Sequence, residues 1–82
     1  MKKNRKASSE ILWRLATNLK RLRKARGYTQ HELARRCGFS AGYIGDIERE
    51  VVNLSLANLE NLAFGLGCSE YDLLLPMRPG QR

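Results

Sequence analysis

The stretch that decides the fold is TQHELARRCGFSAGYIGDIE, residues 29–48. Thr29 and Glu32 match the capping box of a helix start, in which the Thr hydroxyl accepts from the amide three residues on and the Glu carboxylate reaches back. Gly38 supplies the left-handed residue that ends a helix, and Ser40 can cap a second helix. The stretch therefore predicts two short helices joined by a tight turn, which is a helix-turn-helix.

Apolar residues recur at helical spacing on both sides of this stretch. The first run has a leucine every three or four positions, at Leu12, Leu15, Leu19 and Leu22. Further helices should begin after Ser8 or Ser9, after Ser55 and after Ser69, because serine is a favoured N-cap. We find no β-type alternation of useful length. The sequence therefore predicts an all-α fold, a compact five-helix bundle that contains the helix-turn-helix.

The 82 residues of the chain suffice for one domain. We expect a folded domain over residues 9–76, preceded by a flexible basic arm at residues 1–8 and followed by a tail at residues 77–82. No uncharged apolar run approaches the length of about 18 residues that a membrane span needs. Charged residues also interrupt the first apolar run, which argues against a signal peptide. We therefore expect a cytoplasmic protein that does not associate with a membrane.

Positive charge is concentrated in the first part of the chain. Residues 1–50 hold 13 basic and 5 acidic side chains, whereas residues 51–82 hold 2 and 3, within a net charge of +7. A surplus confined to one part of a small domain is typical of a protein that binds a polyanion. The charge pattern therefore favours a protein that binds nucleic acid. The alternative is a basic protein that has no particular partner.

The cysteines and the single histidine do not form a metal-binding or catalytic pattern. Cys37 and Cys68 lie 31 positions apart with no CxxC motif. We expect both as free thiols that act as small apolar side chains. His31 begins a match to the zinc-protease motif HExxH, but Arg35 stands where the second histidine is needed. We therefore predict no catalytic residue, no cofactor and no metal.

Three segments of the chain resemble a known family: TQHELA at residues 29–34, GFS at 38–40 and YIGDIE at 43–48. They are similar to the lambda-repressor-like, or XRE-type, DNA-binding domain, and the likeness extends over about residues 15–75. In pattern the chain is closest to the small controller proteins of restriction–modification systems. Stand-alone phage repressors and antitoxins share most of the same residues.

The resemblance implies that the second helix of the unit enters the major groove of DNA. The residues that it places at the DNA are Thr29, Gln30, Arg36, Ser40, Ala41, Gly42, Tyr43, Asp46, Arg49 and Asn53. Gln30 and Arg36 are expected at phosphates, and a solvated surface amide is the alternative for Gln30. Arg49 is expected at a guanine or a phosphate, and a solvated charge at the helix end is the alternative.

The chain departs from the family pattern within the reading helix. Ala41 and Gly42 carry no hydrogen-bonding side chain, which reduces base readout through bidentate pairs. Ala41 can touch a thymine methyl, and Gly42 lets the backbone approach the DNA. Tyr43, Arg49 and the shape of the DNA must then supply more of the discrimination. Asp46 has three open roles: accepting from cytosine N4, repelling other partners, or holding a neighbouring arginine.

Two further groups of residues have structural roles. The family pairs the residues that match Arg23 and Glu48, which implies a partly buried ion pair and excludes Arg23 from the DNA surface. The last helix carries more large apolar residues than one small core can cover. Tyr71, Leu74 and Leu75 are therefore expected at a homodimer interface, and internal packing of all three is the alternative.

We therefore expect a sequence-specific transcriptional regulator, either a repressor or a controller protein. One helix-turn-helix covers only a half-site, so we expect a homodimer on a palindromic operator in double-stranded DNA. The alternative is a protein-interaction adaptor or antitoxin-type module of the same fold with weak or no DNA binding.

Overall fold

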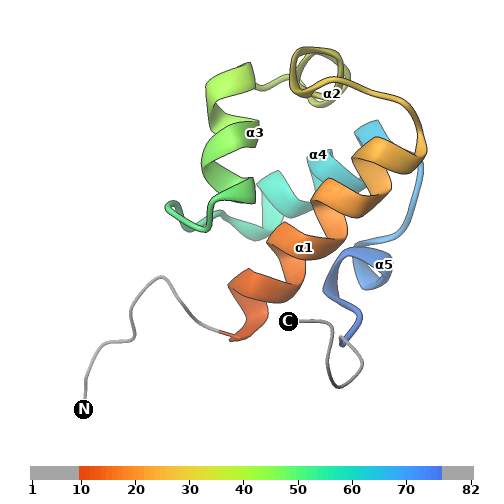
Figure 1. The fold of residues 1–82 in the computed structure, drawn as a ribbon. Coiled ribbons are helices and arrows are strands. Elements are labelled where there is room, and N and C mark those ends of the chain that lie inside the picture. Colours follow the sequence, from red (N-terminus) through yellow and green to blue (C-terminus); the bar gives the residue numbers. More distant parts are fainter. Residues whose placement is uncertain (1–9, 77–82) are drawn as a thin grey trace.

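Figure 1 shows the computed structural model of the protein, which describes residues 10–76. The described residues form the helices α1 (Glu10–Ala25), α2 (Gln30–Cys37), α3 (Ala41–Glu48), α4 (Leu56–Leu66) and α5 (Glu70–Leu74), and none of them lies in a strand. This architecture confirms the predicted all-α fold of five helices. The predicted arm at residues 1–8 and tail at residues 77–82 lie outside the described residues. None of the described helices is both long and apolar enough to cross a membrane.

Hydroxyl side chains start four of the helices, at the positions that the sequence predicts. Thr29 Oγ1 accepts from the Glu32 amide at 3.0 Å, and Glu32 Oε1 accepts from the Thr29 amide at 2.8 Å. Ser69 starts α5 with the same reciprocal arrangement. Ser40 and Ser55 cap α3 and α4 in turn. These local bonds satisfy amides that a helix start leaves without a partner, so each short helix has a defined beginning.

The end of α3 differs from the ends of the other long helices. The helices α1, α2 and α4 are followed by glycines with positive φ, namely Gly27, Gly38 and Gly67. After α3 the same position is held by Glu50, with φ of 64°. The Glu50 amide donates to the Ile47 carbonyl at 3.0 Å. The Val51 amide donates to the Asp46 carbonyl, also at 3.0 Å, which completes a Schellman motif around a glutamate.

The core is built from one apolar face of each helix. Its most deeply buried apolar side chains are Leu19, Leu33, Ile44, Ile47, Leu62, Leu66 and Leu73. Because all five helices contribute to this set, their apolar stripes fix how the helices cross. In Figure 1, α2 and α3 lie next to each other on the same side of α1, and α5 lies beside α1. The helix-turn-helix therefore rests on a core to which every other element contributes.

Gly65 allows α4 to pack closely against the end of α2. A Cβ atom at this position would overlap the Cys37 sulfur. Cys37 is buried, and desolvation raises the pKa of its thiol to about 11. The structure thus gives Cys37 the packing role that the sequence predicts, and both cysteines are free thiols.

Asn18 is a fully buried polar residue that joins α1 to the end of α5. Its Nδ2 donates to the carbonyl oxygens of Leu73 at 2.9 Å and of Leu75 at 3.1 Å. Its Oδ1 accepts from Arg21 Nη2 at 3.0 Å. These bonds satisfy carbonyls that a helix end leaves open, so they fix the short α5 against α1. No local sequence pattern predicts this contact.

Candidate nucleic-acid interface

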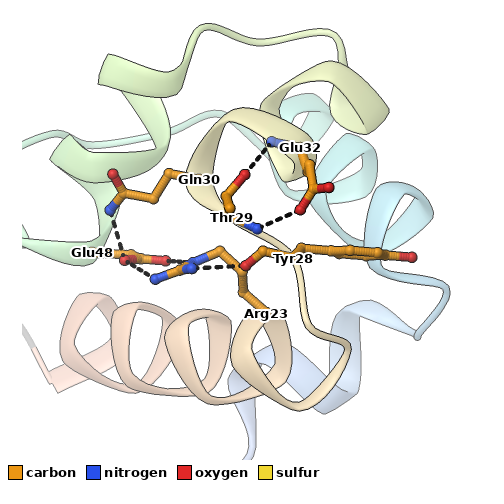
Figure 2. Close-up of polar contacts among 6 residues, drawn as sticks. All are labelled: Arg23, Tyr28, Thr29, Gln30, Glu32 and Glu48. Carbon is orange, nitrogen blue, oxygen red and sulfur yellow. Dashed lines mark hydrogen bonds and ion pairs between the residues drawn. The ribbon is translucent and has the colours of Figure 1, made fainter.

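A polar network joins α1, α2 and α3 beneath the helix-turn-helix (Figure 2). Arg23 Nε donates to Glu48 Oε2 at 2.7 Å, and Arg23 Nη2 donates to Glu48 Oε1 at 3.2 Å. Arg23 Nη1 donates to the Tyr28 carbonyl at 2.9 Å, and Gln30 Nε2 donates to Glu48 Oε1 at 3.0 Å. The two charged side chains are only 11% and 4% exposed. The network therefore fixes the angle between α2 and α3. Any ligand of this surface would meet the two helices as a rigid unit.

Gln30 lies where α2 begins, at the edge of the exposed surface. The bond to Glu48 uses one of the two hydrogens on its amide nitrogen, so a second donor remains. Thr29 is exposed at the cap, and the Glu32 carboxylate is held over the start of α2. Hydrogen bonding from the Thr29 amide is the main cause that lowers the pKa of Glu32. The start of α2 thus offers donors from Gln30 but also carries a fixed carboxylate.

The first half of α3 presents small side chains and one anchored aromatic ring. Ser40 and Gly42 are exposed, and Ala41 is half-buried. The Tyr43 ring meets the Phe39 ring edge to face, with centroids 4.9 Å apart. The Tyr43 hydroxyl accepts from Asn58 Nδ2 at 2.9 Å. Tyr43 is therefore held from both sides, by the turn before α3 and by α4.

Asn58 is a residue of this surface that the sequence analysis missed. It lies 15 positions after Tyr43, and nothing in their local patterns relates the two. The only sequence signal is that Asn58 follows the N-cap Ser55 in the first turn of α4, where its amide donates to the Ser55 hydroxyl. Asn58 and Tyr43 come together because α4 packs near the turn before α3. Their spacing in the sequence does not predict this contact.

The second half of α3 carries an exposed ion pair. Arg49 Nη2 donates to Asp46 Oδ1, and the two side chains are 65% and 42% exposed. The guanidinium folds back over α3. Its Nη1 atom lies so near Gly45 that a Cβ atom built on this glycine would be 3.2 Å away. Among the three roles left open for Asp46, its geometry matches the holding of a neighbouring arginine. Asn53, in the loop that follows, is exposed.

Arg36 occupies a different part of the molecule from the residues of α3. Its guanidinium carbon lies 4.5 Å from the centroid of the Tyr28 ring. Figure 2 shows that this ring points away from α3 and from Gln30. The structure therefore does not bring Arg36 together with the residues at the start of α2, and its expected phosphate contact stays a prediction.

Basic side chains of α1 adjoin the end of α3. Lys20, Arg21 and Lys24 line an open pocket of about 340 Å³ together with Glu48 and Glu50. All three are exposed. Their spacing of three and four residues was a signal that one face of α1 concentrates positive charge.

The residues expected at a homodimer interface differ in exposure. Tyr71 is 70% exposed, while Leu74 and Leu75 are half-buried. Leu74 lines an apolar pocket of about 220 Å³, whose rim includes Ile11 and Leu56. Leu56 is 80% exposed at the start of α4. An exposed apolar surface thus extends from α5 across to α4 and the first turn of α1.

Candidate metal ligands and nucleophiles are not gathered into one site among the described residues. Between residues 10 and 76 there is no group of three or more His, Cys, Asp or Glu side chains that could hold a metal ion. His31 is exposed and Cys37 is buried, so the structure does not assemble the two into a nucleophile and its base. Hydrogen-bond donors and small side chains instead surround the first turn of α3.

Known proteins are similar to this chain in both sequence and fold. A sequence model of the helix-turn-helix family matches residues 19–73. A hypothetical transcription factor of Neisseria meningitidis is 44% identical over 62 residues, which are 76% of this chain and 58% of the length of that protein. The crystal structure of the hypothetical transcription factor NHTF from Neisseria has a TM-score of 0.78 at 36% identity, and the match covers 93% of this chain and 86% of that one.

A second solved structure belongs to a restriction–modification controller protein, C.AhdI from Aeromonas hydrophila. It has a TM-score of 0.73 at 35% identity, and the match covers 76% of this chain and 94% of the controller. The likeness thus extends over about three quarters of this chain and nearly the whole length of the controller.

Proposed function

Since the chain belongs to the helix-turn-helix family of DNA-binding transcriptional regulators, we propose that it recognises a palindromic operator as a homodimer. The observation that carries this proposal is the rigid α2–α3 unit, held from below by Arg23 and Glu48, with the first turn of α3 left exposed. In helix-turn-helix proteins the second helix of such a unit reads the major groove. In this chain that helix is α3.

The proposed base contacts come from α3 and the residue that ends it. Ala41 meets a thymine methyl, and Gly42 lets the backbone approach the bases because it has no side chain. Tyr43 keeps its hydroxyl hydrogen free to donate, because the bond from Asn58 uses it only as an acceptor. Arg49 supplies the strongest hydrogen-bond donor of the surface. With so few side chains to read bases, bending of the DNA contributes more of the specificity.

Most of the proposed phosphate contacts flank these residues, and Arg36 stands apart from them over the Tyr28 ring. Gln30 and Thr29 stand at the start of α2, where the helix dipole also favours an anion. Asn53 stands in the loop after α3 and Arg36 near the end of α2. The basic face of α1, with Lys20 and Lys24, adds positive charge beside the end of α3. Such contacts fix the register of the protein on DNA and carry no base identity.

A second copy of the chain is proposed to cover Tyr71, Leu74 and Leu75. Full burial of one large apolar side chain contributes about 1.5–3 kcal/mol, and two-fold symmetry applies each gain twice. The apolar pocket beside Leu74 and the exposed Leu56 next to it support an interface at this face. Leu74→Asp should therefore give a folded monomer in sedimentation. A dimer that survives this substitution would move the interface elsewhere, for example to Trp13 on α1.

The likeness to C.AhdI supports a role as the controller of a restriction–modification system. A phage-type repressor is the other regulator that this pattern fits. The neighbouring gene separates the two, because an adjacent endonuclease indicates a controller and an adjacent integrase indicates a prophage.

A protein-interaction adaptor is the second candidate function. The observation that favours it is the lack of hydrogen-bonding side chains at Ala41 and Gly42. Selection from a pool of random-sequence duplexes separates the two candidates. A DNA-binding regulator should enrich one sequence with two-fold symmetry. If no sequence rises above the starting pool, the proposal of operator recognition fails and the adaptor function is favoured.

A further inference from the structure

The guanidinium of Arg49 lies in a seat formed by Gly45 and Asp46, and the side chain of Gln30 also lies near Gly45. Asp46, one helical turn earlier, accepts a hydrogen bond from Arg49 Nη2. A Cβ atom on Gly45 would lie 3.2 Å from Arg49 Nη1 and 3.6 Å from Gln30 Oε1. The charged head of Arg49 therefore lies over the middle of α3, close to the start of α2, although much of its side chain is exposed.

Gly45 is explained by this seat and not by its backbone conformation. It lies inside α3 without the positive φ that favours glycine. A glycine inside a helix costs about 1 kcal/mol relative to alanine. A Cβ atom at this position would press on Arg49 Nη1, so the guanidinium would have to shift by a few tenths of an ångström, whereas Gln30 would be at ordinary contact distance. The glycine thus gives up helix stability and creates room for the guanidinium.

The carboxylate of Asp46 changes what Arg49 can bind. An arginine has five N–H donors, and the bond to Asp46 occupies one of them. The remaining donors match the O6 and N7 acceptors of guanine, which is the base that arginine reads most often. A free arginine would also be drawn to phosphates, which attract every sequence equally. A carboxylate beside it offsets that uniform attraction and leaves the directional contact to the base.

We propose that Gly45 and Asp46 are positioning residues that hold Arg49 as a guanine reader and suppress its contact with phosphates. The inference rests on the proposed function, because it assumes that α3 faces the bases. It assigns the chain one guanine contact in each half-site. It also gives the acidic Asp46, which by itself repels DNA, a role in sequence discrimination.

The test compares two duplexes, the sequence most enriched by the wild-type protein and a scrambled version of it. Asp46→Asn preserves the size of the side chain but removes its charge. We expect the ratio of the two affinities to fall by about tenfold. We also expect the affinity for the scrambled duplex to rise, with a salt dependence steeper by about two units in log–log slope, one for each protomer of the dimer. Glu70→Gln, which removes an exposed acid from α5, is the matched control and should leave the ratio unchanged.

A second arm repeats the Asp46 change in an Arg49→Ala background. If Asp46 acts through Arg49, the ratio should no longer respond to Asp46→Asn there. An equal fall in both backgrounds would overturn the proposal, since Asp46 would then read a base itself. An unchanged ratio in the wild-type background would overturn it as well.

NMR relaxation of the Arg49 Nε–H bond measures, without DNA, whether the guanidinium is held in its seat. The bond should be ordered in the wild-type protein and mobile in Asp46→Asn and Gly45→Ala. Equal mobility in all three proteins would contradict the seat. If the wild-type protein enriches no duplex, the proposed function fails and this inference fails with it. If it enriches one and the Asp46 change has no effect, this inference alone fails.

Discussion

Two carboxylates of α3 each pair with an arginine, and the two pairs differ in almost everything except their chemistry. Arg23 and Glu48 lie 25 residues apart and form two hydrogen bonds, with side chains 11% and 4% exposed. Arg49 and Asp46 lie three residues apart and form one, with side chains 65% and 42% exposed. The acid of the first pair and the arginine of the second are neighbours in the chain, yet one points into the protein and the other out.

This difference separates a structural pair from a pair that is available to a ligand. Buried charges that have left water depend on each other, so loss of one partner leaves an uncompensated charge. Exposed charges keep their contact with water, and their mutual attraction contributes about 0.2–1 kcal/mol at most. The buried pair should therefore govern folding and the exposed pair should govern binding.

The largest expected effect comes from breaking the buried pair. Arg23→Ala or Glu48→Ala should lower the free energy of unfolding by about 3–5 kcal/mol, measured by urea denaturation. The double variant should lose less than the sum of the two single losses. Lys24→Ala, an exposed change in the same helical turn, is the control and should lie within about 0.5 kcal/mol of the wild-type protein. Additive losses in the double variant would show that the two side chains act independently.

The reverse pattern is expected for the exposed pair. Arg49→Ala should change the free energy of unfolding by no more than about 0.5 kcal/mol. It should weaken binding to the enriched duplex by about 1–3 kcal/mol and relax the preference at one position in each half-site. Titration of duplexes that differ at single base pairs measures both effects. Full affinity and full preference in this variant would remove Arg49 from the reading surface.

Gln30 and Arg36 sharpen the comparison, because only Gln30 contacts the buried pair. Each change to alanine should weaken all duplexes by similar factors, since phosphates carry no base identity. Gln30→Ala should also lower the free energy of unfolding by about 1 kcal/mol, through loss of its bond to Glu48. Arg36→Ala loses only the contact with Tyr28 and should cost about 0.5–1 kcal/mol. A loss confined to one duplex sequence would contradict the phosphate assignment.

The smallest expected effect lies just beyond the exposed pair, at Glu50. A residue other than glycine in the left-handed region costs about 1–2 kcal/mol, so a glycine at this position would relieve that strain. The flexibility of glycine in the unfolded chain offsets part of the relief. Glu50→Gly should therefore raise the free energy of unfolding by about 0.5–1 kcal/mol. Glu50→Gln, which removes the charge but keeps the side chain, separates strain from electrostatics. A glycine variant no more stable than the glutamine variant would show that the backbone there is not strained.

The parts of the fold that the sequence predicts are those set by neighbouring residues. The reciprocal pattern of Thr29 and Glu32 and the glycines after the helices act within one turn, so their effect can be read from the chain. Glu50 was missed because glutamate gives no signal of a left-handed residue. Its conformation is imposed by the bonds that close α3.

The parts that the sequence does not predict depend on contacts between distant elements. Asn18 holds the end of α5 across 55 positions, and Asn58 holds Tyr43 across 15. Asparagine is common on surfaces, so its type does not reveal either role. The position of Arg36 over the Tyr28 ring is likewise not indicated by its residue type.

The most direct test of DNA recognition by this chain is the salt dependence of its binding to the enriched duplex. If a dimer neutralises about six to ten phosphates, the logarithm of the affinity should fall against the logarithm of the salt concentration with a slope of about −5 to −9. Fluorescence anisotropy over a series of potassium chloride concentrations measures this slope. A value in that range is the predicted result. A slope shallower than about −2 would contradict a DNA-binding regulator and favour the adaptor function.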